Sequence, residues 1–82
     1  MITVTVKLFA AYQEAYRRSE LLLELPDQTT VQALCDRILG EHPELEPWRS
    51  QTRYGVNLQF VDPDTVLSHG DEVVLIPPVS GG

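Results

Sequence analysis

The middle of this chain carries its one long apolar stripe of helical periodicity. The members of the stripe recur every three or four residues, which places them on one face of a helix; they are Val31, Leu34, Cys35, Ile38 and Leu39. Thr29 precedes Gln32 at capping-box spacing, and Gly40 is typical of a helix end. An amphipathic helix needs an apolar surface to cover, so the rest of the chain must supply one.

Alternating apolar residues before and after the stripe in the sequence predict that this surface is a β-sheet. Ile2, Val4, Val6 and Leu8 alternate with polar residues, which is the pattern of a strand with one face on the core. Further strands are predicted at 21–25, 53–56, 58–61 and 72–76, with turns at 62–64 and 69–71 and a brief helix or turn at 10–18. We expect an α+β fold in which one main helix covers a mixed sheet of about four to five strands.

Two further expectations concern how the chain is divided. The segment 41–51 reads as an irregular connection, anchored to the core by Leu45 and Trp48. A chain of 82 residues hides roughly 60–65% of its unfolded surface, which leaves little material for a private catalytic cleft. We therefore expect one domain over 1–76, a flexible tail over 77–82, and no enzymatic activity without a partner that supplies the active site.

Charge and cysteine usage exclude several classes of protein. The formal charge of −6, with only six Lys and Arg, argues against nucleic acid as a ligand and favours basic protein partners. The lone Cys35 excludes an internal disulfide and a thiolate zinc site, and its place on the apolar stripe predicts a buried side chain. His42 and His69 have no partner at metal-ligand spacing, so we expect no metal. No apolar run approaches membrane-spanning length, and we expect a cytoplasmic protein.

The C-terminal residues are the strongest functional feature of the sequence. Pro77 and Pro78 end the last strand because they lack backbone donors, and they favour an extended continuation. The final Gly81 and Gly82 have no side chains, so the terminal carboxylate is unhindered. The chain end is also thin enough to enter a narrow channel that any Cβ would block. The alternative is a frayed chain end without function.

A di-glycine end directly after the last strand of a small α+β domain resembles the ubiquitin-like β-grasp proteins. Within that superfamily the chain is similar to the small subunits of molybdopterin synthase. The matching segments are Val56-Asn57, Leu67, Gly70-Asp71-Glu72-Val73 and Ile76-Pro77-Pro78-Val79-Ser80-Gly81-Gly82.

This resemblance implies a chemical role for the chain end. The carboxylate of Gly82 would be adenylated by a separate ATP-dependent activating enzyme and converted by a persulfide donor protein to a thiocarboxylate. Val79, Ser80 and Gly81 would enter the large synthase subunit, where sulfur passes to cyclic pyranopterin monophosphate and builds the molybdopterin dithiolene. The synthase would be a heterotetramer whose active site lies in the large subunit. The carrier would bind no cofactor, and the activating enzyme would consume the ATP.

Strand parity predicts where such a partner docks. If Val6 and Leu8 face the core, Phe9 lies on the opposite face, and the same reasoning places Ile76 there. Phe60 is expected to join them, and exposed apolar side chains beside a projecting tail favour a protein interface. The alternative is that Phe9 and Ile76 lie beneath the short helix or the Trp48 segment.

Three other functions remain open from the sequence. The first is a sulfur carrier for thiamine or another sulfur-containing metabolite. The second is a ubiquitin-like tag that is conjugated to protein lysines, and the third is an interaction module whose terminal glycines have no chemical role.

Overall fold

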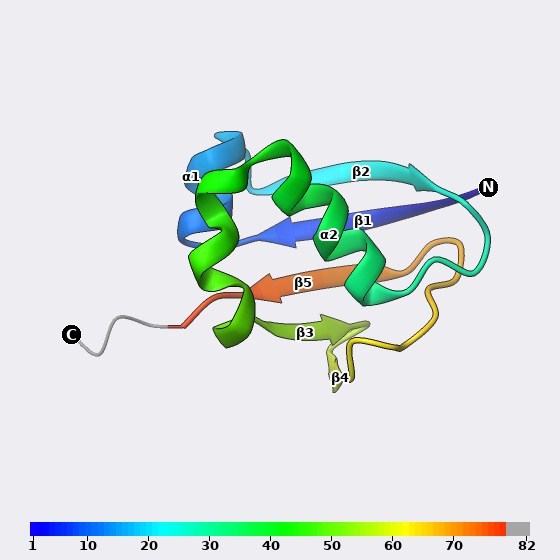
Figure 1. The fold of residues 1–82 in the computed structure, drawn as a ribbon. Coiled ribbons are helices and arrows are strands. Elements are labelled where there is room, and N and C mark those ends of the chain that lie inside the picture. Colours follow the sequence, from blue (N-terminus) through cyan, green and yellow to red (C-terminus); the bar gives the residue numbers. More distant parts are fainter. Residues whose placement is uncertain (79–82) are drawn as a thin grey trace.

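The computed structural model describes residues 1–78 and consists of a five-stranded sheet with helices packed on one face (Figure 1). The elements in chain order are β1 (Ile2–Leu8), α1 (Ala11–Tyr16), β2 (Glu20–Leu25), α2 (Val31–Glu41), the 3-10 helix η1 (Pro43–Gln51), β3 (Arg53–Val56), β4 (Gln59–Val61) and β5 (Glu72–Ile76). The sheet order is β2-β1-β5-β3-β4; β1 and β5 pair in parallel and the other neighbours are antiparallel. This mixed sheet confirms the expected α+β class.

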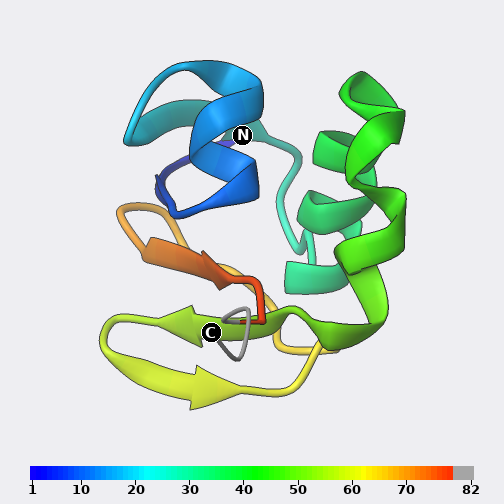
Figure 2. The same ribbon diagram turned by 90° about the vertical axis from the view of Figure 1, so that its left-hand side faces the viewer.

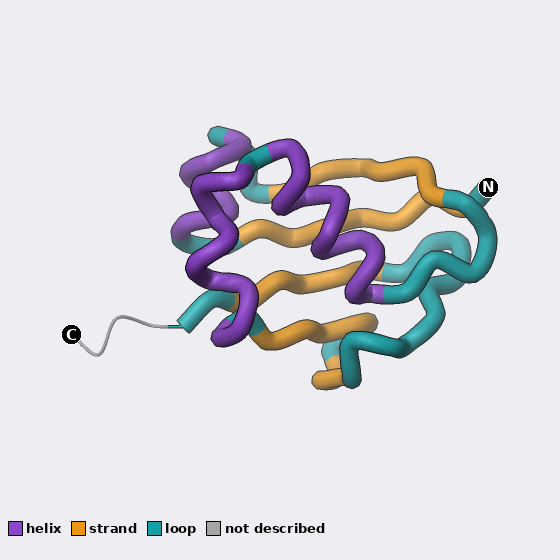
Figure 3. The backbone as a smooth tube through the Cα atoms, in the orientation of Figure 1, coloured by secondary structure: helices purple, strands orange, loops and turns teal. Residues whose placement is uncertain are grey.

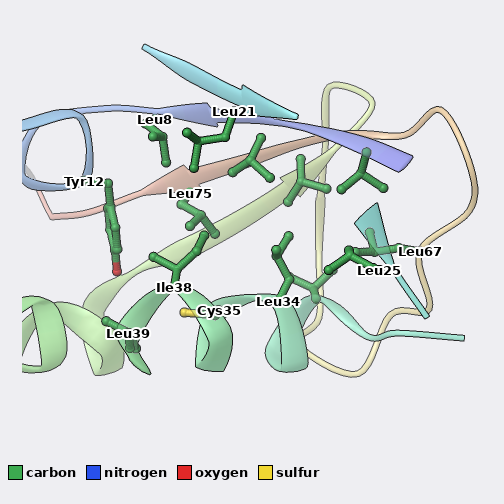
Figure 4. Packing of buried hydrophobic residues seen from close by; sticks show 14 of the residues in the cluster. Leu8, Tyr12, Leu21, Leu25, Leu34, Cys35, Ile38, Leu39, Leu67 and Leu75 are labelled. Atoms are coloured by element: carbon green, nitrogen blue, oxygen red, sulfur yellow. The ribbon is translucent and has the colours of Figure 1, made fainter. Parts of the chain in front are cut away.

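The core lies between α2 and the sheet. Along β1 the apolar side chains at every second position are buried, and on α2 every residue of the predicted stripe is buried. Figure 4 shows the two sets facing one another, with Leu34, Cys35 and Ile38 of α2 opposite Leu8 and Leu75 of the strands. Periodicity of two in the strands and about 3.6 in the helix therefore located this core from the sequence.

The start and end of α2 differ from the prediction. Thr30, not Thr29, is the N-cap: its Oγ1 accepts the amide of Ala33 at 3.1 Å, while the Thr29 hydroxyl donates to the carbonyl of Pro26 at 2.6 Å. Gly40 lies inside the last turn, and the helix continues to Glu41. Both threonines have a hydroxyl that can cap a helix. Thr30 takes this role because it is held in place by an isolated β-bridge to Val66.

The segment 41–51 is not an irregular connection. It forms η1, in which Pro43 occupies the first turn, where its missing amide costs no hydrogen bond. Leu45 is buried as predicted, but Trp48 is 38% exposed, so Leu45 alone anchors the segment in the core. The Arg49 guanidinium contributes a second attachment, since it pairs with Glu46 in η1 and with Asp36 in α2.

A buried hydroxyl pair links α1 to the residue after η1. The Thr52 hydroxyl donates to the Trp48 carbonyl at 2.8 Å, so it must accept from the Tyr12 hydroxyl, which lies 2.6 Å away. Because each hydroxyl carries one proton, both groups are satisfied by this arrangement. It fixes α1 against η1 at the end of the sheet where β1 ends.

Replacement of Tyr12 by phenylalanine is expected to destabilise the fold by about 1 kcal/mol, because one buried hydrogen bond is lost and no donor is stranded. Thermal unfolding followed by circular dichroism should show a midpoint about 4–8 °C lower. The matched control is Thr52→Ser, which keeps the hydroxyl and should lower the midpoint less. A midpoint for Tyr12→Phe equal to that of the unmodified chain would contradict this role.

Candidate functional site

The last described residues leave the sheet from its middle. β5 lies between β1 and β3, and Figure 1 shows its end at the edge where β1 ends and α1 begins. Pro77 follows Ile76 directly and is buried, and Pro78 is half-buried. Together with residues Ser50 to Arg53, these prolines line a hollow of about 550 Å³. The base of the tail is thus packed against the end of η1 and the start of β3.

The helices leave the opposite face of the sheet uncovered. Figures 2 and 3 show α2 and η1 together on one side of the strands. On the other side a shallow apolar hollow of about 250 Å³ opens close to the end of β5. Its lining residues come from the end of β1, the β3–β4 hairpin and β5; they are Phe9, Gly55, Leu58, Gln59, Phe60, Val74 and Ile76.

The three residues that were expected on this face, two of them from strand parity, lie together around this hollow. Phe9 is 48% exposed and Phe60 is 73% exposed, whereas Ile76 is half-buried. The pairing register explains their common face, because Gly55 is opposite both Phe60 and Val74, and Val74 is two residues from Ile76 on the same strand. Neither α1 nor η1 contributes a lining residue to this hollow.

Four lining residues were not predicted from the sequence: Gly55, Leu58, Gln59 and Val74. Gly55 forms part of the floor, and a glycine inside a predicted strand is the pattern that marks a close approach or an open surface. Val74 has the same parity as Ile76 and was available to the same argument. Leu58 was assigned to a strand, but it lies in the turn before β4 and is 90% exposed.

The other reactive side chains of the described residues are held in structural contacts. Cys35 is fully buried and accepts a hydrogen bond from the Tyr54 hydroxyl at 3.6 Å, and burial raises the pKa of its thiol. A raised pKa and a buried sulfur are the opposite of what a reactive thiolate needs.

Both histidines are also engaged. Nδ1 of His69 accepts the backbone amide of Thr3 at 3.0 Å, and Nδ1 of His42 lies 3.1 Å from Glu44 Oε2. Over residues 1–78 no group of three or more His, Cys, Asp or Glu side chains is placed to hold a metal ion. In the same range no helix is long and apolar enough to span a membrane.

The predicted tail residues Val79, Ser80, Gly81 and Gly82 lie outside the described residues. The structure therefore defines the base from which they continue, at Ile76 and the two prolines. This base lies at the half-buried end of β5, beside the exposed apolar hollow that Ile76 helps to line. Such an arrangement suits chemistry that is carried out by other proteins on the chain end.

Comparison with known proteins begins with sequence. The model of the ThiS family matches residues 6–82. The chain is 40% identical to the molybdopterin synthase sulfur carrier subunit of Mycobacterium tuberculosis, with 100% of both chains covered. It is 32% identical to the protein of the same name from Arabidopsis thaliana, over 99% of this chain and 84% of that one.

Solved structures extend the likeness to the fold. SAMP1 from Haloferax volcanii is 28% identical with a TM-score of 0.81, over 98% of this chain and 99% of that chain. Subunits 1 and 2 of the molybdopterin-converting factor from Helicobacter pylori were solved as a complex; the match is 27% identical with a TM-score of 0.67, over 99% of this chain and 100% of that one. A ubiquitin from Caldiarchaeum subterraneum shares the fold at 21% identity, with a TM-score of 0.67 over 99% and 98% of the two chains.

These likenesses confirm the ubiquitin-like β-grasp fold that the sequence predicted. The family match runs from β1 to the terminal glycine, and so includes the base of the tail and every residue that lines the apolar hollow. By sequence and by fold, the chain belongs to the ThiS family, whose matching relatives include molybdopterin synthase sulfur carrier subunits.

Proposed function

We propose that this chain is the sulfur carrier subunit of a molybdopterin synthase. The observation that carries the proposal is a Gly-Gly terminus that follows, after two prolines, the central strand of a β-grasp sheet beside an uncovered apolar hollow. Relatives with 40% and 32% identity bear this function in their names. The proposal places the carrier in the cytoplasm, because a single unpaired cysteine is typical of proteins in a reducing compartment.

The proposed chemistry takes place at the carboxylate of Gly82. A carboxylate is a poor electrophile, and adenylation by an ATP-dependent activating enzyme gives it a good leaving group, AMP. The outer sulfur of a persulfide on a donor protein then displaces AMP and forms an acyl disulfide. A thiol attacks the donor's sulfur in this disulfide, which breaks the S–S bond, releases the thiocarboxylate and leaves the donor as a disulfide with that thiol. The thiocarboxylate sulfur is the nucleophile that is passed to cyclic pyranopterin monophosphate. No side chain of the carrier takes part, which accords with the buried and structural state of Cys35.

The apolar hollow is the proposed docking site for the large subunit, which supplies the active site. Phe9 and Phe60 offer exposed aromatic surface of the kind that dominates binding energy in interfaces. In the Helicobacter pylori complex a similar chain is bound to its second subunit. Docking beside the base of the tail would direct Val79, Ser80 and Gly81 into the partner.

Replacement of Gly55 by valine tests this docking site. A Cβ at position 55 meets Gln59 O at 3.6 Å and the Val74 Cβ at 3.7 Å, which is ordinary contact, so the strand tolerates it. The added side chain fills the floor of the hollow and is expected to weaken binding of the large subunit about tenfold, or 1.4 kcal/mol. Titration calorimetry measures the affinity, and thermal unfolding should show an unchanged or higher midpoint.

The control for that experiment is Gly40→Ala on α2, where a Cβ meets no atom within 4 Å. This variant should bind like the unmodified chain. Equal affinities for Gly55→Val and Gly40→Ala would show that the large subunit docks elsewhere.

Mass spectrometry and reconstitution test the function itself. After co-expression with an activating enzyme and a persulfide donor, the intact chain should gain the mass that replacement of oxygen by sulfur produces. The purified thiocarboxylate and a large subunit should then convert cyclic pyranopterin monophosphate to molybdopterin. An unchanged mass would contradict every sulfur carrier assignment, and sulfuration without conversion would favour a carrier for thiamine or another metabolite.

A ubiquitin-like tag is the second candidate function. It is favoured by the likeness to SAMP1, whose name in another solved structure is small archaeal modifier protein 1. A tag forms an isopeptide bond to lysine through the same activated terminus. Covalent ladders on other proteins, detected by immunoblot against this chain, would support this function.

A further inference from the structure

The turn between β3 and β4 has a backbone conformation that is unusual for the residue types that form it. Val56 pairs with Gln59, so Asn57 and Leu58 alone make the turn. Their φ angles are +51° and +70°, and positive φ at both positions is the requirement of a type I′ turn. Glycine is the favoured residue at the second position, because a side chain there is strained. Leucine therefore occupies a site whose backbone conformation disfavours it.

The rest of the fold holds this turn in place. The Asn57 side chain donates to Asp71 Oδ1 at 2.9 Å and accepts the Glu72 amide at 3.0 Å, while the Asn57 amide donates to the Glu72 carbonyl at 2.9 Å. Asp71 is fixed in turn, since its second carboxylate oxygen accepts the Ser68 amide at 2.7 Å. Asparagine suits the left-handed region and explains the first turn position, but none of these bonds involves Leu58.

Packing among residues 1–78 does not explain why a leucine occupies position 58. Its side chain is 90% exposed, the highest fraction among the exposed large apolar residues, so it gives the core no packing. It stands on the rim of the hollow with Phe9, Phe60 and Ile76. Figure 2 shows the β3–β4 turn projecting on the side of the sheet away from α2 and η1, which is the uncovered side.

We propose that Leu58 is a specificity-determining contact for the large synthase subunit, retained at a backbone position that would otherwise favour glycine. This inference rests on the proposed function and adds one residue to the proposed docking site. The hydrogen bonds of Asn57 hold the backbone of the turn, so little backbone conformational entropy is lost when a partner covers Leu58. The partner is expected to carry a complementary apolar recess beside the surface that covers Phe60.

The proposal requires that stability and binding change in opposite directions. Leu58→Gly removes the strain at positive φ and should raise the midpoint of thermal unfolding by about 4 °C. The same variant loses the apolar contact and should bind the large subunit about tenfold more weakly. Leu58→Met keeps an apolar side chain of similar volume in the same turn and should retain most of the affinity.

Affinity is measured by titration calorimetry with the purified large subunit from the same organism. An unchanged affinity for Leu58→Gly, with normal binding by the unmodified chain, would overturn the proposal and leave the proposed function intact. A lower midpoint together with weaker binding would also overturn it, because Leu58 would then serve the fold. Absence of binding by the unmodified chain would overturn the proposed function and this inference with it.

Discussion

Deletion of Gly82 is expected to abolish sulfur transfer and to leave the stability of the domain unchanged. The shortened chain still ends in a carboxylate, at Gly81, but its reach is reduced by about 3.5 Å. Under the proposed function, a displacement of this size would remove the reacting atom from the position at which the activating enzyme and the large subunit act. Among the described residues the hydrophobic core cluster runs from Ile2 to Leu75, so thermal unfolding should not change.

Two measurements test the effect of the Gly82 deletion. Intact mass after co-expression reports sulfuration, and conversion of cyclic pyranopterin monophosphate with the large subunit reports transfer. Gly82→Ala is the matched control, since it retains the length and the carboxylate and adds only a Cβ; it should retain more activity than the deletion. Full transfer by the deletion variant would refute a mechanism based on the terminal glycine.

Replacement of Phe60 by alanine is expected to weaken binding of the large subunit about 30-fold, or 2 kcal/mol. Phe60 is 73% exposed, so its loss costs the free domain little packing and the midpoint of unfolding should shift by less than about 4 °C. An exposed aromatic ring that lines an apolar hollow is the kind of side chain that partners cover completely. Titration calorimetry with the large subunit measures the effect.

Leu22 provides the control for Phe60→Ala. This leucine is 74% exposed on the edge strand β2 and does not line the hollow, so Leu22→Ala should leave the affinity nearly unchanged. If both variants lost the same affinity, general surface hydrophobicity and not the hollow would drive binding. If Phe60→Ala lost stability in proportion to affinity, the ring would belong to the core.

Local periodicity predicted most of the sheet and much of the candidate site. Val73 and Leu75 are buried as their alternation indicates, and the same alternation requires Val74 and Ile76 to face the other way. Phe9 was placed by continuing the parity of β1 by one residue. These inferences succeed because the side-chain period of a strand is set by backbone geometry and depends little on distant parts of the chain.

The features that were missed depend on contacts between distant residues. The turn at Asn57 and Leu58 lacks the glycine that signals a type I′ turn, and it is held by Asp71 and Glu72 from another segment. Thr30 becomes the cap of α2 because Val66 pairs with it. Prolines usually indicate irregular chain, yet Pro43 is compatible with the first turn of η1. No local pattern contains this information.

The parallel pairing of β1 with β5 has a mechanical consequence for a chain whose end is handled by other proteins. The two strands run side by side, so a pull on the chain end along β5 is directed parallel to the strands. Such a force loads the hydrogen bonds to β1 and β3 together, in shear, and they cannot open one after another as in a zipper. The domain is therefore expected to resist unravelling when its chain end is pulled in this direction.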